Sequence, residues 1–247
     1  MITIYICIYN EKEFDVLEES VDSVCLNHIA EFYLYEYYIV GEKSYKLKPL
    51  HEYREHISNG YKLMEEGDYS NAVNEWLKAL DDNPVSVEVL GKLASCYKYL
   101  YDIEKEYEYT VKAYDYCCTR AEMAAYYRNL GWYYLEKYKP EVSVACYKYS
   151  GLFVKTDQVY SEIHFLEAAT QKSFKDLSVE AIQKILVEES IPIKANSVTL
   201  ALIYKAGLEA YDNGNIKEAY ECFCMVYDLT QDEEVEQIIK HLELSDA

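Results

Sequence analysis

A regular spacing of small and aromatic residues between Tyr53 and Pro84 limits the fold of this chain more than any other feature of its sequence. Ala72, Trp76 and Ala79 lie at positions i, i+4 and i+7, which places all three on one face of a helix. Gly67 is suited to the end of a preceding helix, and Pro84 cannot continue the helix that follows. The pattern therefore predicts two helices joined by a turn, a unit that buries its apolar face only by stacking on a neighbour.

The unit recurs along the chain. Ala94 takes the place of Gly60 at the start of an equivalent pattern in the second unit. The second unit departs from the pattern at Glu106 and Thr110, where a small residue and an aromatic residue are expected. We therefore expect its second helix to pack loosely. A third unit follows over residues 130–150, with Gly131 at the small position.

The pattern weakens and then returns toward the C-terminus. A fourth unit, Asp157 to Pro192, is degenerate, and a fifth runs from Gly207 to Phe223. Residues 232–243 then predict one amphipathic helix, because Val235, Ile238, Ile239 and Leu242 repeat at helical spacing. A helix of this kind is expected to cap a repeat array, whose last unit would otherwise expose its apolar face to water.

The first unit resembles the tetratricopeptide repeat, a helix–turn–helix motif of about 34 residues. The residues that carry the resemblance are Gly60, Ala72, Trp76, Ala79 and Pro84. It implies a mainly α fold over residues 51–247: an α-α superhelix of about five helix pairs with a C-terminal capping helix. It also implies a protein that binds another protein or a peptide in a concave groove, and that is not an enzyme.

Residues 1–50 predict a small β–α–β element in front of the repeats. Met1 to Tyr9 alternates in the manner of a strand, and Phe14 to Leu26 has the apolar spacing of a helix. Glu31 to Val40 is aromatic and strand-like, and a turn after it could lead into a further strand at Ser44 to Lys48. An exposed edge strand in this element could pair with a second copy and make a homo-oligomer.

Residues 1–45 also resemble the start of a family-2 glycosyltransferase. The resemblance rests on an apolar strand that ends in Tyr9-Asn10-Glu11 and on a helix carrying Leu17, Ser20, Ser23 and Val24. The acidic turn of that family is replaced by Gly41-Glu42-Lys43-Ser44, and the chain contains no Asp-x-Asp motif. This resemblance leaves an alternative function open, that of a catalytically inactive accessory or regulatory protein derived from such an enzyme.

The charge balance excludes some classes of partner. The formal net charge is −20, so the chain lacks the basic surface with which proteins displace the counterions of nucleic acid. An anionic membrane surface would repel it, and no run of apolar residues approaches the roughly 18 needed to span a bilayer. We expect neither a nucleic-acid partner nor a membrane partner.

The chemistry-bearing residues predict no cofactor, no metal and no catalytic site. His51 and His56 are five positions apart, about 140° around a helix, whereas a zinc helix needs two histidines at i and i+4. The eight cysteines include no Cys-x-x-Cys pair, and the N-terminus lacks the cationic start of a secretion signal. These features favour reduced thiols in a cytoplasmic protein.

The tetratricopeptide register predicts which side chains line the concave groove. Several are basic or aromatic, although the chain as a whole is acidic. A groove of this character would take a peptide that carries carboxylates, since Tyr, Trp and Arg dominate binding hot spots. The alternative is that these are ordinary solvated residues. The predicted groove residues are Arg54, Tyr61, Lys92, Lys98, Tyr99, Arg128, Asn129, Trp132, Tyr204 and Lys205.

Overall fold

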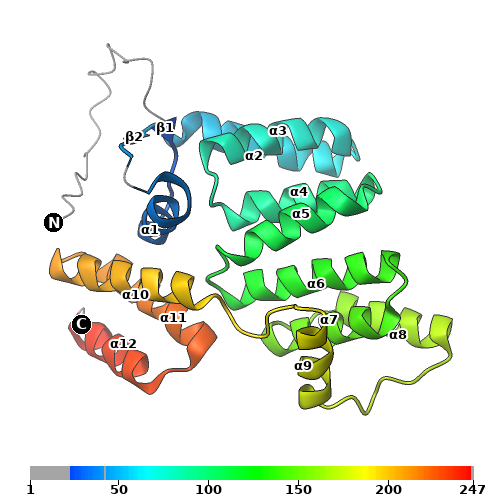
Figure 1. Ribbon diagram of the computed structural model, residues 1–247. Helices are drawn as coiled ribbons and strands as arrows, with labels where there is room; N and C mark the ends of the chain where they lie inside the picture. The colour runs from blue at the N-terminus through cyan, green and yellow to red at the C-terminus, as the bar shows by residue number, and fades with distance from the viewer. Residues whose placement is uncertain (1–22, 42, 246–247) are drawn as a thin grey trace.

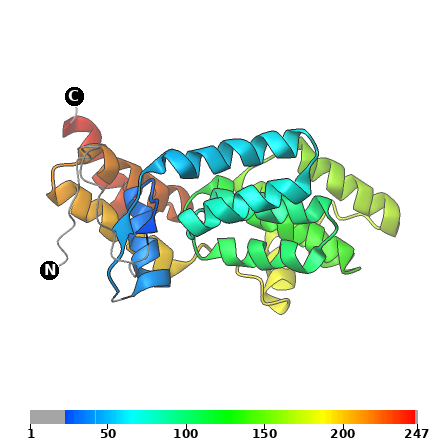
Figure 2. The same ribbon diagram turned by 90° about the horizontal axis from the view of Figure 1, so that it is seen from above.

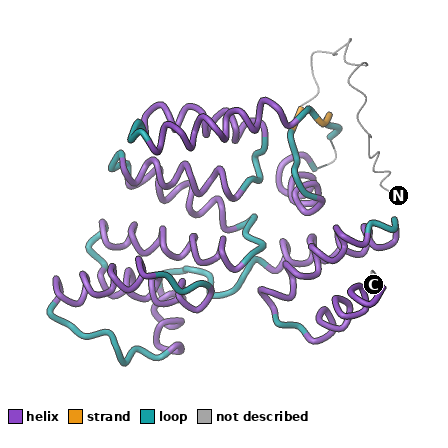
Figure 3. The backbone as a smooth tube through the Cα atoms, turned by 180° about the vertical axis from the view of Figure 1, so that it is seen from behind, coloured by secondary structure: helices purple, strands orange, loops and turns teal. Residues whose placement is uncertain are grey.

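The computed structural model describes residues 23–41 and 43–245, and this part of the chain is mainly helical (Figure 1). It contains twelve α-helices, one short π-helix and two strands of two residues each. The view in Figure 3 shows the two strands side by side at one end of a molecule otherwise made of helices and loops. Within these residues, no helix combines the length and the apolar character needed to cross a membrane.

The N-terminal element is a β–α–β unit, but its parts differ from the predicted ones. Strand β1 (Ser23–Val24) pairs in parallel with β2 (Lys46–Leu47), and between them lie α1 (Ile29–Tyr35) and the π-helix η1 (Glu36–Val40). The strand expected within 44–48 is confirmed. The strand expected over 31–40 is wrong, because this segment is helical. Of the helix expected over 14–26, residues 14–22 lie outside the described residues, and its end is wrong because residues 23 and 24 form β1.

Tertiary packing explains why the aromatic segment is a helix. Ala30, Tyr33 and Leu34 lie at i, i+3 and i+4 and are buried, so α1 offers one apolar face to its neighbours. His28 caps the helix by accepting a hydrogen bond from the backbone N–H of Ala30 at 3.1 Å. Aromatic residues favour strands only where a pleated surface is available to pack against. The strand predicted for Met1 to Tyr9 and the Tyr9-Asn10-Glu11 motif lie outside the described residues.

Three helix pairs follow, at the places where the repeat pattern predicts them. They stack in chain order, so that the second pair lies between the first and the third (Figure 1). The bounds are α2 (Leu50–Glu65) and α3 (Tyr69–Asp82), α4 (Val87–Tyr99) and α5 (Ile103–Tyr114), and α6 (Arg120–Glu136) and α7 (Pro140–Phe153).

Close contacts between a glycine and an aromatic ring hold three of the pairs together. A Cβ added to Gly60 would lie 2.6 Å from Cε2 of Trp76, and one added to Gly131 would lie 2.9 Å from Cε1 of Tyr147. Gly207 has the same relation to Phe223, at 3.1 Å from Cζ. The interval in the sequence between glycine and ring is identical in all three pairs, so the same contact recurs at the same place in each.

The second pair has different residues at the positions of the glycine and the ring. Ala94 takes the place of the glycine, and Thr110, at the same interval after it, takes the place of the ring. The structure does not show the loose packing that we expected from this departure. Glu106 and Thr110 are both 1% exposed, and Thr110 donates a hydrogen bond from Oγ1 to Oε1 of Glu106 at 3.1 Å. A buried, hydrogen-bonded polar pair therefore fills space that an aromatic side chain fills in the neighbouring pairs.

The turn inside each pair requires a left-handed residue, which is glycine in some pairs and tyrosine in others. Gly67 and Gly214 have φ values of 78° and 76°, and Tyr101 and Tyr138 occupy the equivalent positions with φ values of 57° and 58°. The left-handed region is unfavourable for a residue with a Cβ, so the two tyrosines hold their backbone under strain.

Replacing Tyr138 with glycine should therefore stabilise the protein. The tyrosine is 93% exposed, so little packing is lost. Relief of the left-handed strain, ~1–2 kcal/mol, should exceed the extra chain entropy of glycine, ~0.5–1 kcal/mol. The free energy of unfolding, measured by urea denaturation, should rise by about 0.5–1 kcal/mol in Tyr138→Gly. Tyr138→Ala keeps the strain and is the control; an equal gain in both variants would contradict this explanation.

The stacking order changes after the third pair. Helices α8 (Asp157–Thr170) and α9 (Val179–Glu188) both pack on α7, and the chain then returns across the molecule. Helices α10 (Ser197–Asp212) and α11 (Ile216–Thr230) form the last pair, which lies against α1 (Figures 1 and 2). The predicted C-terminal helix is confirmed as α12 (Glu233–Ser245), which covers α11 with Val235, Ile239 and Leu242 buried.

Three tyrosine hydroxyls fix the returning segment in place. Tyr127 donates to the carbonyl oxygen of Pro192 at 2.6 Å, Tyr149 to that of Ile193 at 2.6 Å, and Tyr114 to that of Lys194 at 2.9 Å. Three successive carbonyls are thus bound by three different helices, α5, α6 and α7. We call this arrangement the tyrosine clamp.

The N-terminal element connects the first pair to the last pair. On one side, the backbone N–H of Cys25 donates to the carbonyl oxygen of Asp82 at 2.8 Å, and Lys48 forms an ion pair with the Asp82 carboxylate. On the other side, the Tyr33 hydroxyl binds Glu209, and the Tyr38 and Thr199 hydroxyls are 3.1 Å apart. The two ends of the described chain therefore lie against each other (Figure 2).

Candidate ligand-binding cleft

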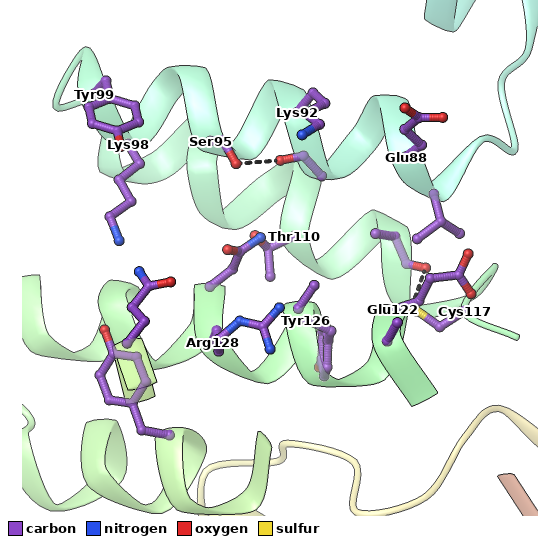
Figure 4. Close-up of a pocket in the computed structure, with 18 residues that line it drawn as sticks. Glu88, Lys92, Ser95, Lys98, Tyr99, Thr110, Cys117, Glu122, Tyr126 and Arg128 are labelled. Atoms are coloured by element: carbon purple, nitrogen blue, oxygen red, sulfur yellow. Dashed lines mark hydrogen bonds between the residues drawn. The ribbon is translucent and has the colours of Figure 1, made fainter. Parts of the chain in front are cut away.

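A cleft of about 510 Å³ opens between α4, α5 and α6 (Figure 4). Tyr147 from α7 and Gln158 from α8 also reach it. The helices that form it belong to the second and third pairs, so its walls are set by the packing of two neighbouring repeats. We call it the α4–α6 cleft. Its polar and charged lining residues are Glu88, Lys92, Ser95, Lys98, Tyr99, Thr110, Glu122, Tyr126, Arg128, Asn129, Tyr147 and Gln158.

Five of the ten predicted groove residues line this cleft. Lys92, Lys98 and Tyr99 come from α4, while Arg128 and Asn129 come from α6. In Figure 4 the Lys98 side chain extends from α4 into the space between α4 and α6, and Arg128 lies on the opposite side of that space. The repeat register thus assigned to one surface residues that are more than thirty positions apart in the sequence, such as Lys92 and Arg128, and these two do line the same cleft.

Two other predicted residues lie beneath the cleft cations. Trp132 is 7% exposed and is a core residue, with the Lys98 ammonium 5.4 Å from its ring centroid. Tyr61 lies under Lys92, whose ammonium is 4.6 Å from the ring centroid, and its hydroxyl donates to Glu88 at 2.6 Å. Both aromatics support the lysines but do not line the cleft.

The remaining three predicted residues lie elsewhere. Arg54 is exposed on α2, in a separate shallow depression beside Leu50 and Glu55. Tyr204 packs against Phe223 in the last pair, and the Lys205 ammonium lies 5.4 Å from the ring centroid of Tyr33. The repeat register predicted that residues of the fifth pair lie on the same surface as the others. This pair instead packs against α1, because the chain turns back across the molecule after α9.

The cations of the α4–α6 cleft have no carboxylate partner in the described part of the chain. Elsewhere, lysines such as Lys78 and Lys139 form ion pairs with Glu75 and Glu189 at 2.6 Å. Lys92 and Lys98 face aromatic rings instead. The Nη1 atom of Arg128 is buried without any hydrogen-bond partner. Unpaired, partly buried cations are unusual in a chain with 44 acidic and 24 basic residues.

Burial acts on these cations directly. It lowers the pKa of Lys98 and the pKa of Arg128, because a low-dielectric surrounding disfavours the charged form. The guanidinium of Arg128 nevertheless keeps its charge at any physiological pH. More distant carboxylates, with Glu162 first, oppose the effect on the pKa of Lys98 without reaching it as ion pairs. An anion that enters the cleft would stabilise the charged forms of Lys98 and Arg128 and would so offset part of the cost of their desolvation.

The two acidic residues that line the cleft are already engaged. Glu122 accepts hydrogen bonds from the backbone N–H groups of Cys118 and Thr119 at 2.8 and 2.9 Å, in the capping box that begins α6. Glu88 accepts the hydrogen bond from Tyr61. Their carboxylates are held by these donors, which leaves the cations facing the open space.

A third acidic residue, Glu106, is buried directly behind the cleft wall. Its Oε2 atom has no hydrogen-bond partner, and neither has the Tyr147 hydroxyl, which does line the cleft. Burial raises the pKa of Glu106 to about 8. Burial therefore favours the protonated, neutral form of this side chain. The sequence contained a signal for it, namely the departure from the repeat pattern at Glu106 and Thr110, but it did not show that the departure adjoins a cleft.

Other chemistry-bearing residues form no site of their own in the described residues. His56 donates a hydrogen bond from Nδ1 to Oε2 of Glu75 at 2.8 Å, and His51 is exposed. Residues 23–41 and 43–245 hold no cluster of three or more His, Cys, Asp or Glu side chains that could bind a metal. Their seven cysteines are unpaired, and burial raises the pKa of Cys117, Cys146 and Cys222.

Comparisons with models of protein families and with curated proteins find no match to this chain.

Proposed function

We propose that this protein is a non-enzymatic interaction module that holds a peptide segment carrying carboxylates in the α4–α6 cleft. The observation that carries the proposal is the set of three unpaired cations, Lys92, Lys98 and Arg128, on the walls of one cleft. Arg and Lys form charge-assisted hydrogen bonds with carboxylates, and a partly desolvated guanidinium gains most from such a partner.

A tetratricopeptide-like superhelix is the architecture that we propose for the three stacked pairs. The recurring contact between a small residue and a ring, seen at Gly60 and Trp76 and again at Gly131 and Tyr147, supports it. In an array of this type the first helix of each pair faces a concave surface, and α4 and α6 are the first helices of the second and third pairs.

The length of the cleft suggests how much peptide it takes. Val87 and Tyr99 line its two ends along α4, and the twelve steps of the chain between them correspond to about 18 Å of helix. An extended peptide advances about 3.3 Å per residue, so roughly five residues would fill this distance. We infer an extended acidic segment of about this length within a larger partner protein.

Replacing Arg128 should remove most of the affinity for such a segment. The probe is a fluorescein-labelled octapeptide of alternating glutamate and alanine, measured by fluorescence anisotropy at physiological salt. The Debye length of about 8 Å then screens the repulsion from the net charge of −20 but leaves close contacts inside the cleft intact. In Arg128→Gln the Kd should rise at least about tenfold, equal to about 1.4 kcal/mol, because a charged hydrogen-bond donor is lost.

The control variant is Lys184→Gln, which removes an exposed lysine of α9 far from the cleft and should leave the Kd unchanged. An octapeptide of glutamine and alanine should not bind. Equal affinity for the two octapeptides, or an equal Kd in the wild type and Arg128→Gln, would contradict the proposal.

A further inference from the structure

Glu106 is a buried acidic residue that does not line the α4–α6 cleft and has no role in the proposed ligand binding. It lies on α5, is 1% exposed, and faces away from solvent behind the wall that Thr110 contributes to the cleft. One carboxyl oxygen accepts the Thr110 hydroxyl at 3.1 Å, and the other has no partner. Because Glu106 lies directly behind the cleft wall, the charge beside the cleft changes whenever Glu106 gains or loses its proton.

The charged and titratable groups that interact electrostatically with Glu106 lie on neighbouring helices. Lys98 on α4 is the charged group that acts on its carboxyl, and Tyr147 on α7 feels the charge of Glu106 in turn. Glu136 on α6 and Glu162 on α8 act on the same lysine and the same tyrosine. Lys98 thus lines the open cleft and also interacts electrostatically with the buried Glu106.

We infer that ligand binding in the α4–α6 cleft is coupled to the protonation of Glu106. The acidic ligand binds while Glu106 is protonated and is released when Glu106 ionises. This inference rests on the proposed function. With a neutral Glu106, Lys98 is free to bind a ligand carboxylate. An ionised Glu106 offsets part of the charge of Lys98 and adds a negative charge behind the cleft wall.

Linkage gives the inference a second, independent consequence. If the proton on Glu106 favours the ligand, the ligand favours the proton to the same extent. Binding at a pH near or above the pKa of about 8 should therefore take up protons from the buffer. Protonation of Glu106 would then favour acidic ligands over neutral ones, because the affinity for a neutral ligand does not depend on the charge of Glu106.

The test measures the Kd of the glutamate–alanine octapeptide between pH 6.5 and pH 9 in the wild type, in Glu106→Gln and in Glu108→Gln. Glu108 lies on the same helix and is exposed, which makes it the matched control. In the wild type and in Glu108→Gln the Kd should rise up to about tenfold between pH 7 and pH 9, the limit for one coupled ionisation near pH 8. In Glu106→Gln, where an amide keeps the shape without the charge, the Kd should stay constant within about twofold.

Three outcomes are distinguishable. A rise in Kd that persists in Glu106→Gln would overturn the inference and assign the effect to the titration of Lys98. Binding that shows no dependence on pH in the wild type would overturn it as well, while leaving the proposed function intact. The absence of binding at every pH would overturn both.

A calorimetric measurement keeps the inference testable if Glu106→Gln does not fold. Binding of the octapeptide to the wild type at pH 8 is measured in phosphate and in Tris, which differ in their enthalpy of protonation. The observed heats should differ by an amount that corresponds to the uptake of up to about half a proton per peptide, because Glu106, with a pKa of about 8, is already about half protonated at this pH. Equal heats in the two buffers would overturn the inference.

Discussion

Trp76→Ala should lower the free energy of unfolding by about 3–5 kcal/mol, one of the two largest effects expected of a single change in this protein. The indole is fully buried, lies against Gly60 and contacts Tyr61 edge-on with ring centroids 5.2 Å apart. Its removal leaves a cavity between α2 and α3 that the backbone contact at Gly60 cannot close. The indole N–H is buried without a partner, so relief of that penalty places the loss toward the lower end of the range.

A double-mutant cycle with Gly60→Ala separates this explanation from a general loss of hydrophobic surface. Alone, Gly60→Ala overpacks the contact and should cost about 1–3 kcal/mol. In the Trp76→Ala background the added methyl group enters the cavity and should cost nothing or stabilise slightly. Urea denaturation followed by circular dichroism gives all four free energies. Additive effects of the two substitutions would show that the contact does not couple them.

The second large effect is a loss of stability as the pH rises from about 4.5 to 8. Glu106 has its pKa raised from 4.5 to about 8 by burial, so between these values the folded state binds a proton that the unfolded state has lost. The contribution of Glu106 is therefore fully present below pH 4.5 and is lost as the pH rises through 8. The slope reaches at most ~1.4 kcal/mol per pH unit.

Comparison with Glu106→Gln isolates this contribution from that of other titrating groups. The difference in free energy of unfolding, wild type minus variant, should fall by ~3 kcal/mol between pH 5 and pH 8. Glu75 and Glu141, whose pKa values are lowered by hydrogen bonds from Lys78 and Lys172, act in the opposite direction near pH 4 and are unchanged in the variant. Parallel stability curves for the two proteins would contradict the prediction.

The sequence predicted the helix pairs well because their pattern is local. Gly60 and Trp76, or Gly131 and Tyr147, lie within one unit, and their spacing alone implies that two helices meet closely. The first fifty residues were predicted less well. The aromatic run over 31–40 has the composition of a strand, and its helical form depends on the burial of Tyr33 and Leu34 against distant helices.

The candidate site could be predicted only as far as the register is regular. Lys92, Lys98, Tyr99, Arg128 and Asn129 belong to consecutive stacked pairs, so fixed positions in the repeat place them in one cleft. Tyr204 and Lys205 occupy comparable positions in a pair that stacks elsewhere. Nothing local to them indicates this, because the return of the chain depends on hydroxyls of the tyrosine clamp that lie 44 to 80 positions away from the carbonyls they bind.

The tyrosine clamp and the contact between α1 and α10 have a consequence for how such a protein can change its length. In an open array, each unit touches only its neighbours, so duplication or deletion of a unit leaves the remaining contacts intact. Here the two ends of the described chain are packed against each other, and a further unit would separate surfaces that now fit. This closure ties the number of helix pairs to the contact between α1 and α10, so substitutions within the existing units disturb the packing less than the gain or loss of a whole unit would.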